Sequence, residues 1–156
     1  MAPESSPYSG PELAELRTDL AAIVTGGLVT DNVAEKGREL LGLEIVASQV
    51  QLPAGADEDV RDQAFTEALT AVLKEAVEKR LLFRRYRRLL RYVLPLQAEY
   101  LGKSIKERRI AAGMNMTKKP VKPGTIRTYY EPRALDELAK VLVEMEAEHR
   151  GEQSAM

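Results

Sequence analysis

The chain contains no cysteine, and His149 is the only histidine among its 156 residues. Without cysteine it can form no disulfide bond, and it offers no thiolate as a metal ligand or nucleophile. The absence of disulfides fits the reducing cytoplasm, where we expect the protein to lie. The H-E-x-x-H, P-loop and G-x-G-x-x-G motifs are missing as well. We therefore expect a protein that is not an enzyme, with no cofactor, no bound metal and no small-molecule substrate.

Long apolar runs are missing too. No segment approaches the roughly 18 consecutive apolar residues that a transmembrane helix needs. The first residues, MAPESSPYSG, are polar and lack the basic and then apolar pattern of a signal peptide. Hydrophobic residues make up 44% of the chain and charged residues 30%, enough to form both a core and a soluble surface. These values and the length predict a single domain with no membrane partner.

The charges are divided unevenly along the chain, although the net charge is only −1. Residues 1–78 hold 5 Lys and Arg against 15 Asp and Glu, whereas residues 79–133 hold 16 against 3. Residues 134–156 are acidic again, with 2 against 6. A block this basic attracts a polyanion, or else the acidic block of its own chain or of another copy.

Apolar residues recur at helical spacing through most of the sequence, which predicts an all-α single domain of about six or seven helices with a helix-turn-helix-like C-terminal unit. Gly26 and Gly27 indicate the end of the first helix. The longest run, residues 59–94, would exceed about 50 Å as one helix, so we expect a break near residues 79–82. Residues 41–59 are expected to be loop with some helix. The expected helices cover about residues 10–25, 30–41, 59–94, 104–112, 124–130 and 132–150. The expected organisation is a polar leader (1–9), an acidic helical half (10–78), a basic helix and connection (79–102), a helix-turn-helix-like unit (103–150) and a tail (151–156).

The segment LLFRRYRRLLRYVLPL, residues 81–96, is the most basic part of the chain. At about 100° per residue, one helical face carries only arginines and the opposite face only apolar and aromatic residues. The arginine face holds Arg80, Arg84, Arg87, Arg88 and Arg91. The opposite face, expected in the core, holds Leu82, Phe83, Tyr86, Leu89, Leu90, Val93 and Leu94. Because no acid lies between Lys79 and Glu99, we expect these arginines to meet phosphate or the acidic half, if they are not simply solvated.

A second basic region has the layout of a helix-turn-helix. Ser104 and Glu107 form a capping box that starts one helix, and Gly113 is expected to end it. A short helix, GTIRTYY, follows, and Pro132 is expected to start the last helix. The residues expected to contact phosphate are Lys103, Lys106, Arg108, Arg109, Lys118 and Lys119. The residues expected to contact base edges are Thr125, Arg127 and Thr128.

These segments resemble a helical module found in many actinobacterial proteins, beside signalling and defence-type effector domains. The matching pieces are ELLGLEIV (39–46), ALTAVLKEAVE (68–78), SIKERRIAAG (104–113) and TIRTYYEPRALDELAKVL (125–142). The resemblance spans roughly residues 30 to 145 and implies an adaptor function. The segment GTIRTYYE is also similar to the recognition segment of MerR-type regulators, which implies contact with DNA.

Several functions stay open from the sequence. Nine residues, 114–122, separate the two helices, whereas a helix-turn-helix turn commonly has about three or four. The unit can therefore read DNA or only pack the C-terminal part of the domain. The leading hypothesis is a non-enzymatic DNA-binding or DNA-associated regulatory protein, expected to be a homodimer because half-sites come in pairs. The alternatives are an adaptor that recruits an effector or self-associates through acidic-to-basic contacts, and a phage or virion structural component.

Overall fold

The computed structural model describes residues 12–154, and the regular structure of this part of the chain is entirely helical, which confirms the predicted fold class. The α-helices are α1 (Leu13–Gly26), α2 (Thr30–Lys36), α3 (Arg38–Leu41), α4 (Glu44–Ala47), α5 (Glu58–Glu75), α6 (Arg84–Val93), α7 (Ile105–Asn115), α8 (Pro123–Thr125) and α9 (Glu131–Ser154). Two π-helical turns, η1 (Ala76–Arg80) and η3 (Ile126–Tyr130), and a 3₁₀ turn, η2 (Ala98–Tyr100), join them. The predicted leader, residues 1–9, lies outside the described residues, and residues 151–154 of the predicted tail belong to α9.

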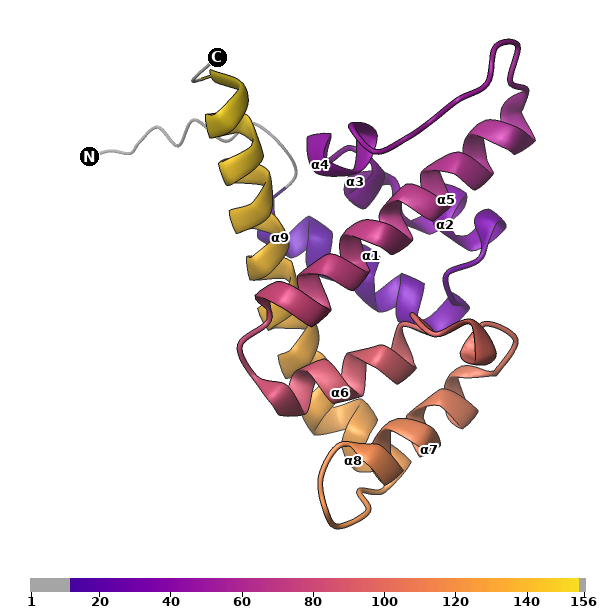
Figure 1. Cartoon of the computed structure of the whole chain (residues 1–156). Coiled ribbons are helices and arrows are strands. Elements are labelled where there is room, and N and C mark those ends of the chain that lie inside the picture. The colour runs from indigo at the N-terminus through magenta and orange to yellow at the C-terminus, as the bar shows by residue number, and fades with distance from the viewer. Residues whose placement is uncertain (1–11, 155–156) are drawn as a thin grey trace.

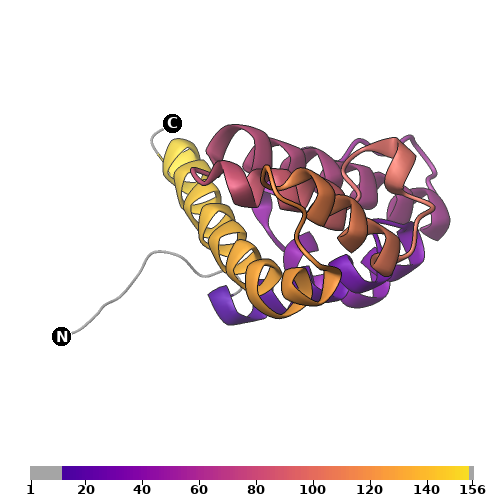
Figure 2. The ribbon, with the colours of Figure 1, turned by 90° about the horizontal axis from the view of Figure 1, so that it is seen from below.

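Helix α9 runs along one side of the domain, and both halves of the chain pack against it (Figures 1 and 2). Helices α1 and α4 contact it from the acidic half, and α6 and η1 contact it from the basic half. Helix α7 packs mainly on α6. No helix within the described residues is long and apolar enough to cross a membrane.

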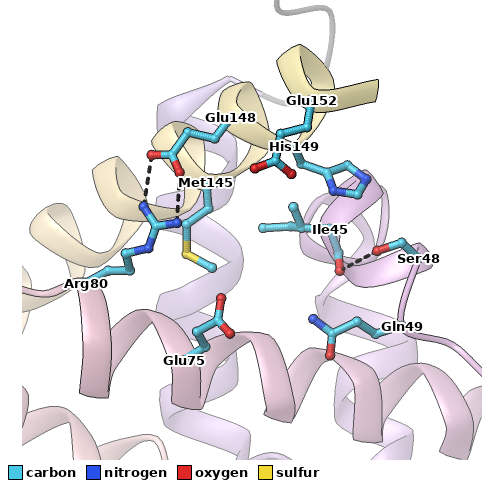
Figure 3. A pocket seen from close by; sticks show the side chains of 9 residues that line it. All are labelled: Ile45, Ser48, Gln49, Glu75, Arg80, Met145, Glu148, His149 and Glu152. Atoms are coloured by element: carbon cyan, nitrogen blue, oxygen red, sulfur yellow. Dashed lines mark hydrogen bonds and ion pairs between the residues drawn. The ribbon is translucent and has the colours of Figure 1, made fainter. Parts of the chain in front are cut away.

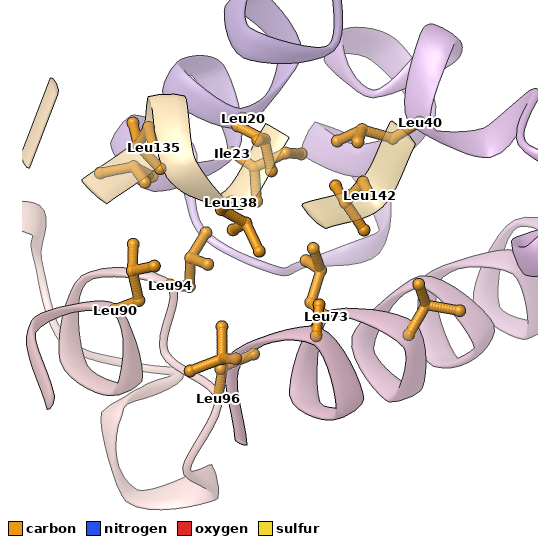
Figure 4. Packing of buried hydrophobic residues seen from close by; sticks show 14 of the residues in the cluster. Leu20, Ile23, Leu40, Leu73, Leu90, Leu94, Leu96, Leu135, Leu138 and Leu142 are labelled. Atoms are coloured by element: carbon orange, nitrogen blue, oxygen red, sulfur yellow. The ribbon is translucent and has the colours of Figure 1, made fainter. Parts of the chain in front are cut away.

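The core forms where α9 lies between α1 and α6. Leu135, Leu138 and Leu142 of α9 are at most 1% exposed, and Figure 4 shows them with Leu20 of α1 and Leu94 at the end of α6. Burying a leucine side chain of this kind stabilises a fold by roughly 2 kcal/mol. Because one face of α9 contacts both halves, the core that it builds is shared by the acidic and the basic parts of the chain.

Two short helices owe their starts to carboxylates from distant helices. Asp19 of α1 accepts hydrogen bonds from the backbone N–H groups of Glu39 (2.7 Å) and Leu40 (3.3 Å) at the start of α3. Burial raises the pKa of Asp19, and these two hydrogen bonds partly oppose that effect. The helix predicted over residues 30–41 is therefore two helices, α2 and α3, which meet at Gly37.

Helix α4 is held in the same way by Glu146 of α9. The fully buried carboxylate of Glu146 accepts hydrogen bonds from the backbone N–H groups of Glu44 (2.9 Å) and Ile45 (3.0 Å). It also lies 3.3 Å from the Arg150 guanidinium. A charge this deeply buried is tolerated because it has hydrogen-bond donors and a counter-charge.

The predicted break in the long helical run is confirmed, and it changes the assignment of two apolar residues. The π-helical turn η1 ends with a hydrogen bond from the Leu81 N–H to the Ala76 carbonyl (2.9 Å), and α6 starts only at Arg84. The prediction that Leu82 and Phe83 lie in the core is wrong, since they are 87% and 52% exposed. The helical wheel failed here because a break between η1 and α6 interrupts the 100° rotation per residue, so Leu81 is buried instead.

The predicted helix-turn-helix-like unit is not confirmed. The segment GTIRTYY is no separate short helix, because α8, η3 and α9 follow one another without interruption from Pro123 to Ser154. Pro132 lies inside this helical path and does not start a new helix. A proline inside a helix removes one backbone donor and crowds the preceding turn. The preceding turn here is the π-helical turn η3, whose wider spacing is seen in the hydrogen bond from the Glu131 N–H to the Ile126 carbonyl.

Gly113 has a different role from the one predicted. Helix α7 does not end there but continues to Asn115. The Gly113 carbonyl accepts a hydrogen bond from the Val121 N–H (2.9 Å), and a Cβ atom at residue 113 would lie 2.0 Å from the Val121 carbonyl oxygen. Glycine is needed because the returning loop packs its backbone directly on the helix.

We predict that Gly113→Ala lowers the free energy of unfolding by about 2 kcal/mol or more, because backbone must move to admit the methyl group. Thermal unfolding followed by circular dichroism measures the effect. Gly124→Ala is the matched control, since a Cβ atom at this exposed helical position meets nothing within 4 Å. The control should unfold at the wild-type temperature or slightly above it. Equal stability of the two variants would contradict the packing role of Gly113.

Candidate nucleic-acid interface

Helix α6 presents two arginines, Arg84 and Arg88, that are exposed and one turn apart. Within the described part of the chain, no carboxylate lies within 4.0 Å of either guanidinium. The first turn of α6 contains no acidic residue either. The two charges therefore have no counter-charge among residues 12–154.

Other arginines of the predicted face have carboxylate partners of their own. Arg91 forms a bidentate ion pair with Glu78, with 2.6 Å between Arg91 Nε and Glu78 Oε2. Arg80 lies on η1, not on α6, and forms a second such pair with Glu148 of α9 at 2.8 and 2.9 Å (Figure 3). Half-buried Arg87 also lowers the pKa of Glu78, and its Nε atom is buried without a hydrogen-bond partner.

The Arg80–Glu148 pair lies on the wall of a hollow between α4, α5 and α9 (Figure 3). Glu75 and His149 line the same hollow, together with apolar side chains such as Met145. Within residues 12–154 no cluster of three or more His, Asp or Glu side chains has the geometry of a metal site. The hydrogen bonds from Arg80 lower the pKa of Glu148, so this carboxylate is an ion-pair partner.

Two of the α7 residues predicted to contact phosphate instead make contacts inside the domain. Arg108 is 2% exposed and donates hydrogen bonds to the backbone carbonyls of Val93 and Lys103. Burial lowers the pKa of Arg108, and the neighbouring charge of Arg109 lowers it further. Arg109 forms a bidentate, largely buried ion pair with Glu131 at 2.8 and 2.9 Å. These contacts join α7 to α6 and α9, so we leave both arginines out of the candidate interface.

The remaining predicted residues are on the surface. Lys103 is exposed and lies 4.0 Å from Glu107 within the capping box that the sequence predicted. The Thr128 hydroxyl donates to the Gly124 carbonyl at 2.8 Å, so part of its hydrogen-bonding capacity is already used. The others are exposed and have no carboxylate within 4.0 Å among the described residues: Lys106, Lys118, Lys119, Thr125 and Arg127.

Aromatic side chains that were not predicted from the sequence lie near some of these cations. The rings of Phe83 and Tyr86 are 5.5 Å apart, and those of Tyr129 and Tyr130 are 4.9 Å apart. Arg85, an exposed residue of α6, has its guanidinium 5.9 Å from the centre of the Tyr130 ring. The alternation of arginine and aromatic residues in FRRYRR and in RTYYEPR was the available signal, but only the fold brings the two segments together.

No protein-family model, no curated protein and no solved structure matches this chain. The candidate interface is therefore defined by exposure, charge and geometry alone.

The Glu78–Arg91 pair predicts a pH dependence of stability. The hydrogen bond from Arg91 holds the pKa of Glu78 below its ordinary value of 4.5. A carboxyl whose pKa is lower in the folded state contributes stability above its ordinary pKa, and this contribution is lost as the pH falls through the lowered value. Thermal unfolding between pH 6 and pH 3 should therefore show a steeper acid loss for the wild type than for Glu78→Gln.

Glu67→Gln is the matched control, because Glu67 is an exposed glutamate of α5 with only a glutamine partner. It should follow the wild-type profile. Parallel profiles of the wild type and Glu78→Gln would show that the pair adds nothing to stability.

Proposed function

We propose that this protein is a non-enzymatic, DNA-associated regulatory protein that binds the phosphate backbone through exposed basic side chains. We call these side chains the basic set, and they are Arg84, Arg88, Lys106, Lys118, Lys119 and Arg127. The observation that carries the proposal is the division of the arginines of the basic block into two groups. Arg80, Arg91 and Arg109 have carboxylate partners, whereas Arg84, Arg88 and Arg127 have none among the described residues.

Unpaired arginines on a helix repel one another modestly, so their grouping favours an external anion. Guanidinium groups match phosphate oxygens with two parallel hydrogen bonds, and binding releases condensed counterions from the nucleic acid. The basic set spans α6, α7, the loop of residues 116–122 and η3. Helix α7 packs against both α6 and η3, and the loop is hydrogen-bonded to α7 from the Val121 N–H to the Gly113 carbonyl. Several successive phosphates are therefore accessible to one domain.

Contact with the phosphate backbone of DNA fits this surface better than recognition of base edges in the major groove. Arg127 and Thr128 belong to a helical path that continues for the rest of the described chain, and the long loop before it packs on Gly113. A recognition helix needs an exposed, separately placed face to enter the major groove. We therefore expect binding that depends strongly on salt and weakly on sequence.

An adaptor function is the second candidate. Ile110 and Met114, one turn apart on α7, are 44% and 62% exposed. Two exposed apolar side chains at this spacing are a feature of helices that contact a protein partner.

We predict that the double variant Arg84→Glu and Arg88→Glu weakens binding to duplex DNA by at least about tenfold and reduces the slope of log K against log salt by about two. Fluorescence anisotropy over a salt series measures both quantities. Arg38→Glu with Arg61→Glu is the matched control, because it makes the same charge change at exposed arginines of the acidic half. Unchanged binding by the α6 variant, or equal loss in the control, would argue against the proposal.

Glu78→Gln should have the opposite effect on binding. Removing the carboxylate charge frees the guanidinium of Arg91, one turn from Arg87 and Arg88 on the same helix. We expect tighter binding to duplex DNA and a salt slope larger by about one. Glu67→Gln again serves as the control, since it removes one negative charge without freeing an arginine. A slope that changes equally in both variants would reflect net charge alone.

A further inference from the structure

Two aromatic pairs and two guanidinium groups lie near the junction of α6 with η3 and α9. Arg85, which precedes Tyr86 in the sequence and lies over Tyr130, connects the two pairs. Phe83 contacts Tyr86, and the Arg85 guanidinium lies over Tyr130. Tyr130 in turn contacts Tyr129, and the Arg133 guanidinium lies 3.7 Å from the centre of the Tyr129 ring. We call these six side chains the aromatic–arginine row: Phe83, Arg85, Tyr86, Tyr129, Tyr130 and Arg133.

The row is partly open to solvent at both ends. The Phe83 side chain is 52% exposed at one end, and the Tyr129 side chain is 48% exposed at the other. The inner rings, Tyr86 and Tyr130, are half-buried and pack against the core. The exposed rings are therefore held in place by neighbours that pack against the core. The Arg133 guanidinium lies over one face of the Tyr129 ring, and Tyr129 is still 48% exposed.

The charges along the row have one sign. Arg84, Arg85 and Arg133 are exposed, and no carboxylate among the described residues lies within 4.0 Å of them. Arg133 also donates a hydrogen bond to the Tyr129 carbonyl at 2.8 Å, which fixes its guanidinium over the ring. A ligand that fits this row must carry both negative charge and flat, polarisable groups.

Single-stranded nucleic acid has both properties, because its bases are free to stack and its phosphates repeat along the strand. In a duplex the base faces are stacked on one another and cannot reach an aromatic side chain. Proteins that bind single strands combine a basic track with aromatic rings on which bases stack. Cationic side chains next to rings add to the attraction of the bases for the surface.

We propose that the aromatic–arginine row binds single-stranded DNA or RNA by stacking bases on Phe83 and Tyr129, while Arg84, Arg85 and Arg127 contact the phosphates. This inference rests on the proposed function, because it assigns the preferred ligand of the same basic surface. It adds a preference for single-stranded over duplex nucleic acid. The basic set alone does not have this preference, since phosphate contacts are available equally in a duplex.

The test compares three labelled ligands of about 20 bases by fluorescence anisotropy over a salt series: oligodeoxythymidylate, oligouridylate and a duplex of mixed sequence. The variant is Phe83→Leu with Tyr129→Leu, which removes two exposed rings and keeps the charge. We expect roughly tenfold weaker binding to at least one of the single strands. The affinity for the duplex and the salt slopes should stay at the wild-type values.

Tyr100→Leu is the matched control, because Tyr100 forms an aromatic pair with Tyr92 that is separate from the row. It should bind every ligand like the wild type. The two single strands distinguish DNA from RNA, and a loss restricted to either one supports the row as a single-strand site.

The possible failures are distinguishable. If the Phe83 and Tyr129 variant binds single strands like the wild type while Arg84→Glu with Arg88→Glu loses binding, the stacking inference is overturned and the proposed function stands. If the arginine variant also binds like the wild type, the proposed function fails first. Binding to vesicles of anionic lipid, with none to either oligonucleotide, would overturn the inference in favour of a membrane surface.

Discussion

The apolar face of α9 is the constraint on which the rest of the domain depends. Leu135, Leu138 and Leu142 are buried between α1 and the end of α6, so one helix supplies the core for segments of opposite charge. The hydrophobic effect is non-directional, and it depends on the apolar area that is buried and not on the charge of the segments involved. It can therefore hold an acidic half and a basic block in one fold without requiring their charges to neutralise each other.

This packing decides which cations are available to a partner. Since Leu89, Leu90 and Val93 of α6 are buried, the opposite side of the helix carries the arginines outward. Neutralisation inside the domain is local and incomplete: Glu78 and Glu148 each engage one arginine, and Glu131 engages Arg109. Arg80, Arg91 and Arg109 therefore meet the protein's own acids, whereas Arg84 and Arg88 have no carboxylate within 4.0 Å among the described residues.

Local patterns in the sequence predicted local structure well. The Ser104–Glu107 capping box and the glycine stop at Gly27 are both present, because each depends on residues within one or two turns. The exposure of Phe83, the burial of Arg108 and the packing role of Gly113 depend on segments brought together only by folding. For the same reason the sequence predicted the basic residues of the candidate site but not the grouping of its aromatic rings. These rings come from two segments more than forty residues apart.

The carboxylate of Glu146 caps α4 from 102 residues further along the chain than Glu44. During synthesis at roughly 5–20 residues per second, about 5 to 20 seconds pass between the translation of α4 and that of its cap. Over that interval α4, four residues long, and the inner face of α1 have no α9 to pack against. The acidic half therefore leaves the ribosome before the helix that completes its core, and this core cannot be completed until α9 has been synthesised.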